Sequence, residues 1–136
     1  MGVSIRLAES ADFSGCSELL NILVGASDDD HRLFDAETFN ELISNTRGSL
    51  LVAEEDGGLL GMASISFNLA LRYNGEYCQL EELVVDPKAR GKNVGGLLLE
   101  ETISLAKARG CKELACICLN RLNTMSRSTR NTDSLM

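Results

Sequence analysis

The chain has 136 residues, a net charge of −7 and 44% hydrophobic residues, which is typical of one globular domain with a buried core. Its acidic pI of about 4.7 argues against non-specific binding to nucleic acid or anionic membranes, whose phosphates repel an acidic surface. The sequence has no apolar run near the ~20 residues that span a bilayer, and residues 1–10 lack the pattern of a signal peptide. We therefore expect a cytoplasmic protein, whose charge is compatible with a cationic substrate such as an amine.

Five cysteines are present, and an odd number without a secretion signal indicates free thiols. Cys116 and Cys118 lie two positions apart, on one face of an expected strand. A zinc site needs about four ligands, and the one histidine, His31, is distant in sequence. We predict no metal site and interpret the cysteines as small buried apolar side chains.

The first part of the chain predicts a strand and two helices. A short strand is expected over residues 3–7, a helix over 11–24 after a capping Ser10, and a second helix over 36–44. The apolar stripe of the first helix consists of Cys16, Leu19, Leu20 and Leu23. The loop between the helices carries acidic residues 28–30, which either attract a cationic substrate or are simply solvated.

The middle of the chain predicts antiparallel hairpins. Strands are expected over residues 49–54, 59–71 and 76–85. Residues 56–58 read as one hairpin turn, and the pair Asn74-Gly75 is typical of a type I′ turn.

A glycine-rich stretch then leads into a helix over residues 94–109, which Gly110 ends, and into a strand over 114–119. A strand, a helix and a second strand in succession indicate a parallel strand pair. Residues 120–136 are polar and show no apolar period, which is typical of loop or disorder. We predict a folded core over 1–119 and a polar tail over 120–136.

The junction between the strand at 76–85 and the following helix predicts an anion site. Backbone N–H groups at a helix N-terminus lack helical partners, and the helix dipole favours negative charge there. Glycines that permit close approach are Gly91, Gly95 and Gly96, and cations that add positive charge are Lys88, Arg90 and Lys92. A diphosphate fits this description, and the alternative is an ordinary tight turn. The patterns GxxxxGK[ST] and GxGxxG are both absent, which excludes the two commonest nucleotide-binding loops.

Residues 83–98, LVVDPKARGKNVGGLL, resemble motif A of the GNAT superfamily of acetyl-CoA-dependent N-acetyltransferases. That motif reads [RQ]-x-x-G-x-[GA] after a strand of the form L-x-V-x-P. Arg90 fills its first position and Gly95 its last, while Asn93 replaces the middle glycine. Asn is the side chain that best tolerates a positive φ, so the loop can keep its shape. The similarity covers residues 5–119.

The resemblance implies an α/β GNAT fold with a mostly antiparallel sheet, one splayed parallel strand pair, helices on both faces and a short or atypical C-terminal part. It also implies that acetyl-CoA, a co-substrate, binds between the two parallel strands. The cofactor-binding residues that it implies are Leu83, Val84, Val85, Arg90, Gly91, Lys92, Asn93, Val94, Gly95 and Gly96.

The chemistry requires a base, because an amine of pKa ~10.4 must lose a proton before it attacks. Glu82 and Glu81 are the catalytic candidates, with Glu82 favoured. Since strand side chains alternate, we expect one of the two to face the cleft. Gln79 stands where some family members carry the base, and it cannot act as one.

The C-terminal part departs from the family pattern. The tyrosine that often protonates the leaving thiolate would fall near Arg127, and no such tyrosine is present. A thiol of pKa about 8.5 is a tolerable leaving group without it. The apolar run 114–119 lacks a following partner strand, so we expect either a homodimer or a tail that folds back over this edge.

The leading functional prediction is an N-acetyltransferase in which a small-molecule or protein amine attacks acetyl-CoA directly. One alternative is a non-catalytic acyl-CoA-binding module, and another is a protein-interaction module on the same fold. Neither nucleic acid nor membrane is an expected partner, and the sequence leaves the identity of the acceptor open.

Overall fold

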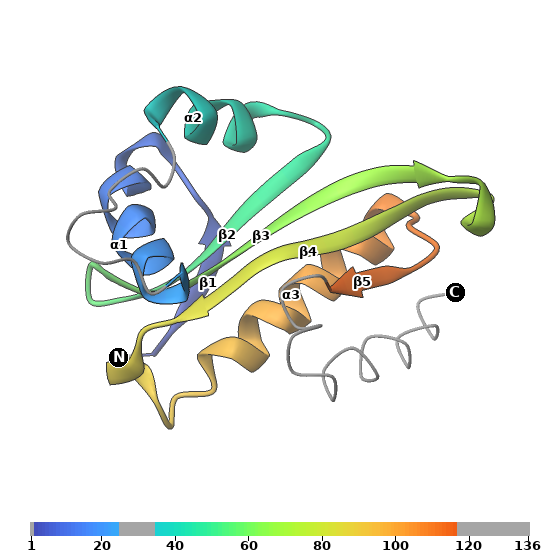
Figure 1. The fold of residues 1–136 in the computed structure, drawn as a ribbon. Helices are drawn as coiled ribbons and strands as arrows, with labels where there is room; N and C mark the ends of the chain where they lie inside the picture. Colours follow the sequence, from blue (N-terminus) through green and yellow to red (C-terminus); the bar gives the residue numbers. More distant parts are fainter. Residues whose placement is uncertain (1, 25–34, 117–136) are drawn as a thin grey trace.

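The computed structural model describes residues 2–24 and 35–116, which form a mixed sheet with helices on both faces (Figure 1). The strands are β1 (Ser4–Leu7), β2 (Gly48–Glu55), β3 (Gly58–Ala70), β4 (Gly75–Val85) and β5 (Leu114–Cys116), and the helices are α1 (Phe13–Val24), α2 (Ala36–Ser44) and α3 (Val94–Arg109). The strand order is β1-β2-β3-β4-β5. The first three pairings are antiparallel, and β4 pairs with β5 in parallel, which confirms the predicted sheet.

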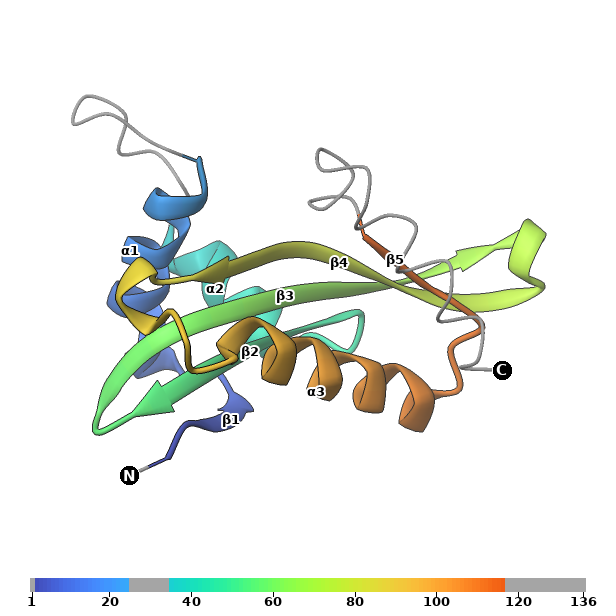
Figure 2. The same ribbon diagram turned by 90° about the horizontal axis from the view of Figure 1, so that it is seen from below.

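Two separate apolar layers hold the helices on the sheet. Helix α3 covers one face, and α1 and α2 cover the other (Figure 2). Fully buried members of the α3 layer are Leu51, Ile65, Leu80, Leu98 and Ala106, and members of the α1/α2 layer are Cys16, Leu19, Phe39, Val52 and Met62. Burying one such large apolar side chain contributes about 1.5–3 kcal/mol. Both faces of the central strands are therefore covered by helices and buried.

The helix boundaries follow from local caps. Helix α2 begins after Asp35, whose carboxylate accepts the backbone N–H of Thr38 at 2.8 Å. Helix α3 ends at Gly110, which has φ 84°. Helix α1 begins at Phe13, later than predicted, because residues 10–12 form a 3₁₀ turn. In this turn Asp12 accepts the N–H of Glu9 at 2.7 Å, so the predicted cap at Ser10 is wrong.

The turn between β3 and β4 also differs from the prediction. A 3₁₀ turn over Leu71–Tyr73 is followed by Asn74 in the left-handed region, with φ 55° and ψ 40°. Gly75 has φ 157°, belongs to β4 and pairs with Ala70. The connection is thus longer than a two-residue type I′ turn, although the predicted antiparallel pairing is confirmed.

Some predicted features lie outside the described residues. They are the acidic loop 28–30, His31, the end of the last strand at 117–119, and the tail 120–136. Within residues 2–24 and 35–116, no helix combines the length and apolar character needed to cross a membrane.

Candidate active site

A β-bulge brings Glu81 and Glu82 onto the same face of the sheet. Across the β3–β4 pair, Ser64 faces Glu82 while the next residue, Ile65, faces Leu80, so Glu81 is an extra residue in β4. Ser64 and Ser66 are two positions apart in β3 and share a face. Ser64 Oγ donates to Glu82, and Ser66 Oγ donates to Glu81 at 2.7 Å. The regular alternation expected along this strand is therefore interrupted by the bulge, and both glutamates lie on one face of the sheet.

The two carboxylates have different surroundings. Oε2 of Glu81 accepts from Ser66 and also from Nε2 of Gln79 at 3.1 Å, and Asn68 donates to Ser66 at 3.0 Å. Among the described residues, the one side chain that hydrogen-bonds Glu82 is Ser64, which is buried with 5% exposure. Within the described part of the chain, neither carboxylate forms an ion pair. Both charges are thus available to a cationic ligand.

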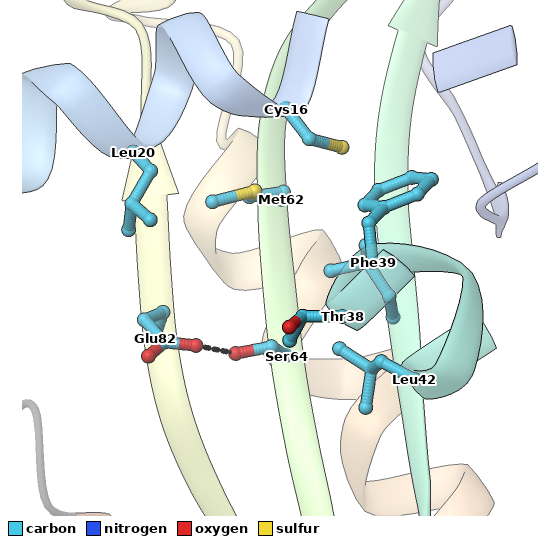
Figure 3. Close-up of a pocket in the computed structure, with 9 residues that line it drawn as sticks. Cys16, Leu20, Thr38, Phe39, Leu42, Met62, Ser64 and Glu82 are labelled. Carbon is cyan, nitrogen blue, oxygen red and sulfur yellow. Dashed lines mark hydrogen bonds between the residues drawn. The ribbon is translucent and has the colours of Figure 1, made fainter. Parts of the chain in front are cut away.

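Glu82 closes one end of a pocket of about 190 Å³ on the α1/α2 face (Figure 3). The pocket is lined by Cys16, Leu20, Thr38, Phe39, Leu42, Leu50, Met62, Ser64 and Glu82. Figure 3 shows Cys16, Met62 and Phe39 gathered away from the Ser64–Glu82 pair. The described lining of the pocket is therefore mostly apolar, with one carboxylate at one end. Glu81 is not among its lining residues.

Cys16 in the pocket wall is a free, fully buried thiol. Burial raises the pKa of this thiol to about 12, because a thiolate would lose its hydration there. At neutral pH the group is protonated, so it contributes apolar surface and not a nucleophile. Cys111 is also free and buried, as the sequence predicts for these thiols.

A second, more open pocket of about 290 Å³ adjoins the first at α2. It is lined by Thr38, Glu41, Leu42, Asn45, Arg47 and Gly48. Thr38 and Leu42 line both pockets, so together they form the boundary between an apolar chamber and a polar surface.

The loop before α3 has the backbone that the sequence predicts. Asn93 adopts φ 58° and ψ 33°, and Gly91 has φ 88°, so both occupy the left-handed region. Asn93 makes no side-chain cap bond, and its side chain lies against Gly96. The first-turn N–H groups of a 16-residue helix are thus left without a side-chain cap. This arrangement fits an anion such as a diphosphate.

The charges of this loop are weaker than predicted. Lys92 Nζ lies 2.7 Å from Glu55 Oε1, and Lys88 Nζ lies 3.8 Å from Asp86 Oδ2. Arg90 is exposed and forms no ion pair with any described residue. Of the three expected cations, Arg90 therefore keeps its charge fully available, while the other two are partly neutralised.

Strand β4 connects the pocket to the loop. Val84 is buried toward the α1/α2 layer, and Leu83 and Val85 pack toward α3. At about 3.3 Å per residue, Val85 lies roughly 10 Å along the strand from Glu82. In the described part of the chain β5 pairs with β4 only over residues 78–80, so backbone groups of 81–85 have no described strand on that side.

Sequence patterns did not identify the walls of the pocket. Cys16, Phe39 and Met62 come from α1, α2 and β3, and each looks locally like an ordinary core residue. Ser64 could not be predicted as a site residue either, because its contact with Glu82 depends on the register between β3 and β4. The one signal in the sequence was the alternation of Met62, Ser64 and Ser66 on one side of the expected strand.

Comparison with known proteins gives a consistent result. The model of the acetyltransferase (GNAT) family matches residues 14–128. The chain is similar to glucosamine-6-phosphate N-acetyltransferase from Arabidopsis thaliana, with 28% identity, a TM-score of 0.74, and coverage of 87% of this chain and 83% of that chain. No curated protein sequence matches the chain.

Two further solved structures share the fold at lower identity. One is an aminoglycoside acetyltransferase from an uncultured soil metagenomic sample, in complex with sisomicin, with 16% identity, a TM-score of 0.75, and coverage of 93% of this chain and 86% of that chain. The other is ribosomal-protein-alanine N-acetyltransferase from Brucella melitensis biovar Abortus 2308, with 21% identity, a TM-score of 0.69, and coverage of 85% and 79%. The acceptors named for these three proteins differ widely, so the likeness does not identify the acceptor of this chain.

Proposed function

Because the chain belongs to the acetyltransferase (GNAT) family, we propose that it is an N-acetyltransferase in which an amine acceptor attacks acetyl-CoA directly in a ternary complex. The observation that carries this proposal is the position of Glu82. Its carboxylate lies at one end of a partly open pocket, and the same strand leads from it to the helix N-terminus of α3. The proposed base Glu82 and the proposed anion site before α3 are therefore separated by only a short stretch of β4 and the following loop.

The cofactor-binding part of the proposal rests on the loop and strand. The N–H groups of residues 94–96 and the exposed Arg90 would hold the diphosphate, and the backbone of residues 83–85 would hold the pantetheine arm. Gly91 supports this assignment because the space where a Cβ would stand is open. When bound, acetyl-CoA supplies an activated acetyl group.

Glu82 is the proposed base. An acceptor of pKa ~10.4 arrives as an ammonium ion, which the Glu82 carboxylate, without an ion-pair partner among the described residues, attracts and from which it takes a proton. The bond from Ser64 Oγ keeps this carboxylate directed at the pocket. The net products are an acetamide, CoA as its thiol, and one proton that passes through Glu82 to solvent. Glu81, which lies outside the pocket, is assigned a supporting electrostatic role.

Two measurements test the proposal. Calorimetric titration with acetyl-CoA should show micromolar binding, and CoA release should then be followed with a panel of amines. Glu82→Gln should lower kcat/KM roughly 100-fold or more while acetyl-CoA affinity stays constant. Glu100→Gln, at an exposed position of α3, is the matched control. Binding of acetyl-CoA without CoA release for any amine would instead favour a non-catalytic acyl-CoA-binding module.

A further inference from the structure

The pocket on the α1/α2 face has a shape and lining that select among amines. We propose that the acceptor is a small primary amine carried on an uncharged apolar body about the size of one aromatic ring. The apolar body occupies the pocket between α1, α2 and β3, and the amine meets Glu82. This inference rests on the proposed acetyltransferase function and specifies its substrate class.

The size of the pocket supports this substrate class. Its volume is about 190 Å³, whereas an apolar cavity of roughly 150 Å³ in another protein binds benzene. Phe39 forms part of the wall and is held edge-to-face by Phe13, with ring centroids 5.5 Å apart and an interplanar angle of 75°. The wall is therefore preformed around a space for one ring or a branched alkyl group.

The lining of the pocket excludes strongly polar acceptors. Six of the nine lining residues that the structure describes are apolar or a protonated thiol, namely Cys16, Leu20, Phe39, Leu42, Leu50 and Met62. A second ammonium group or a row of sugar hydroxyls would lose its hydration against these side chains without gaining partners. Polyamines and aminoglycosides therefore do not fit this chamber.

The charge of the pocket restricts the acceptor further. Among the described lining residues Glu82 is the one that carries a charge, so a single cationic group is matched and a phosphate or carboxylate is not. Arg47 lines the adjoining open pocket and is not among the described residues that line this one. A carboxylate has about four lone-pair sites, so the hydrogen bond from Ser64 leaves room on Glu82 for an ammonium group.

The first experiment compares acceptors on the full chain with saturating acetyl-CoA. CoA release is measured with 2-phenylethylamine, 3-methylbutylamine, ethylamine, putrescine and glucosamine. We expect kcat/KM for 2-phenylethylamine to exceed that for ethylamine, putrescine and glucosamine by roughly 10- to 100-fold, because it buries one additional ring. Equal or faster turnover of putrescine or glucosamine would overturn the proposal.

A pair of variants tests the location. Leu20→Phe places a larger side chain in the pocket, and Ile22→Phe makes the same change at an exposed position of the same helix. The Leu20 variant should raise KM for 2-phenylethylamine and change KM for ethylamine much less, while the Ile22 variant should change neither. A Leu20 variant that binds acetyl-CoA normally and keeps the wild-type KM for 2-phenylethylamine would contradict the proposed location.

A binding measurement separates this inference from the proposed activity. Wild-type protein saturated with CoA, which has no acetyl group to transfer, is titrated calorimetrically with 2-phenylethylamine and with putrescine. Preferential binding of 2-phenylethylamine supports the pocket assignment even if no amine is acetylated, in which case only the catalytic proposal fails. If 2-phenylethylamine neither binds nor reacts while another amine is acetylated, the acetyltransferase proposal stands and the substrate class is wrong.

Discussion

Ser64 and Glu82 face each other directly across the β3–β4 pair, and the Ser64 hydroxyl donates its hydrogen bond to the Glu82 carboxylate. The serine is buried, while the glutamate is half-buried and lines the pocket. The buried hydroxyl of Ser64 therefore holds the carboxylate of Glu82, the proposed base, in position. This relationship makes Ser64 a positioning residue, because it acts on the acceptor through Glu82.

Replacing Ser64 by Ala should lower kcat roughly 10-fold or more, since a hydrogen bond to a charged group contributes about 1.5–3 kcal/mol. The affinity for acetyl-CoA should not change, because the loop before α3 is untouched. Ser64→Thr keeps the hydroxyl and should retain most of the activity. Steady-state kinetics of both variants, with acetyl-CoA calorimetry, provide the check. An Ala variant with wild-type kcat would show that Glu82 needs no such support.

Glu81 and Glu82 should contribute unequally to turnover. Glu81→Gln should cause a much smaller loss than the roughly 100-fold expected for Glu82→Gln, because Glu81 is engaged by Ser66 and Gln79 and does not line the pocket. The amide oxygen of a glutamine at this position can still accept both bonds. The measurement is kcat/KM for the two variants with one acceptor. A larger loss for the Glu81 variant would reverse the assigned roles.

Local signals in the sequence were sufficient to predict most elements. The bounds of α2 and α3 match the prediction because Asp35 at one start, Gly110 at one end and the apolar periodicity between them are local features. The left-handed backbone of Asn93 was expected because Asn93 stands at the middle glycine of the family motif, and Asn tolerates that conformation better than most side chains. The proposed anion site followed from the glycines, the cations and the helix N-terminus, and the family motif indicated acetyl-CoA as its ligand.

The site depends on pairings that local patterns do not contain. The bulge at Glu81 arises from the register between β3 and β4. The sequence of β4 by itself gives no sign of the bulge, because residues before and after Glu81 each follow a regular alternation. The pocket wall requires Cys16, Phe39 and Met62 to meet from three elements. The sequence therefore offered Glu81 and Glu82 as candidate bases, but it did not predict that both carboxylates share a face or which residues surround them.

The Arg6–Asp12 pair predicts a pH dependence of stability. Hydrogen bonds from Arg6 at 2.8 and 3.0 Å hold the pKa of Asp12 below its ordinary value of 3.8. A lowered folded-state pKa means that this stabilisation is present above the unfolded value and is lost as the pH falls through the folded value. Asp12→Asn should therefore destabilise the fold by about 1–3 kcal/mol at pH 7, and less below pH 3.8.

Urea unfolding at pH 7 and at acid pH measures this difference. Glu37→Gln, at an exposed position in α2, serves as the control and should show little change at either pH. If Asp12→Asn costs the same free energy of unfolding at both values, the pair would stabilise the fold by packing and not by charge.

Asn93 offers the sharpest test of the anion site, because its φ of 58° sets the direction in which α3 begins. Asn93→Ala should lower stability by roughly 1–2 kcal/mol, the usual cost of a left-handed backbone for a residue with a Cβ. It should also weaken acetyl-CoA binding. Asn93→Gly restores the motif glycine, removes the side chain that lies against Gly96, and should bind acetyl-CoA at least as tightly as the wild type.

Thermal unfolding and calorimetric titration of the two Asn93 variants provide the comparison. Asn21→Ala, at an exposed position of α1, controls for loss of an Asn side chain from ordinary helical backbone. Equal stability and equal affinity of the Ala and Gly variants would mean that the left-handed conformation does not shape the site. A Gly variant that alone keeps its affinity would show that the backbone of this loop, and not the Asn side chain, holds the cofactor.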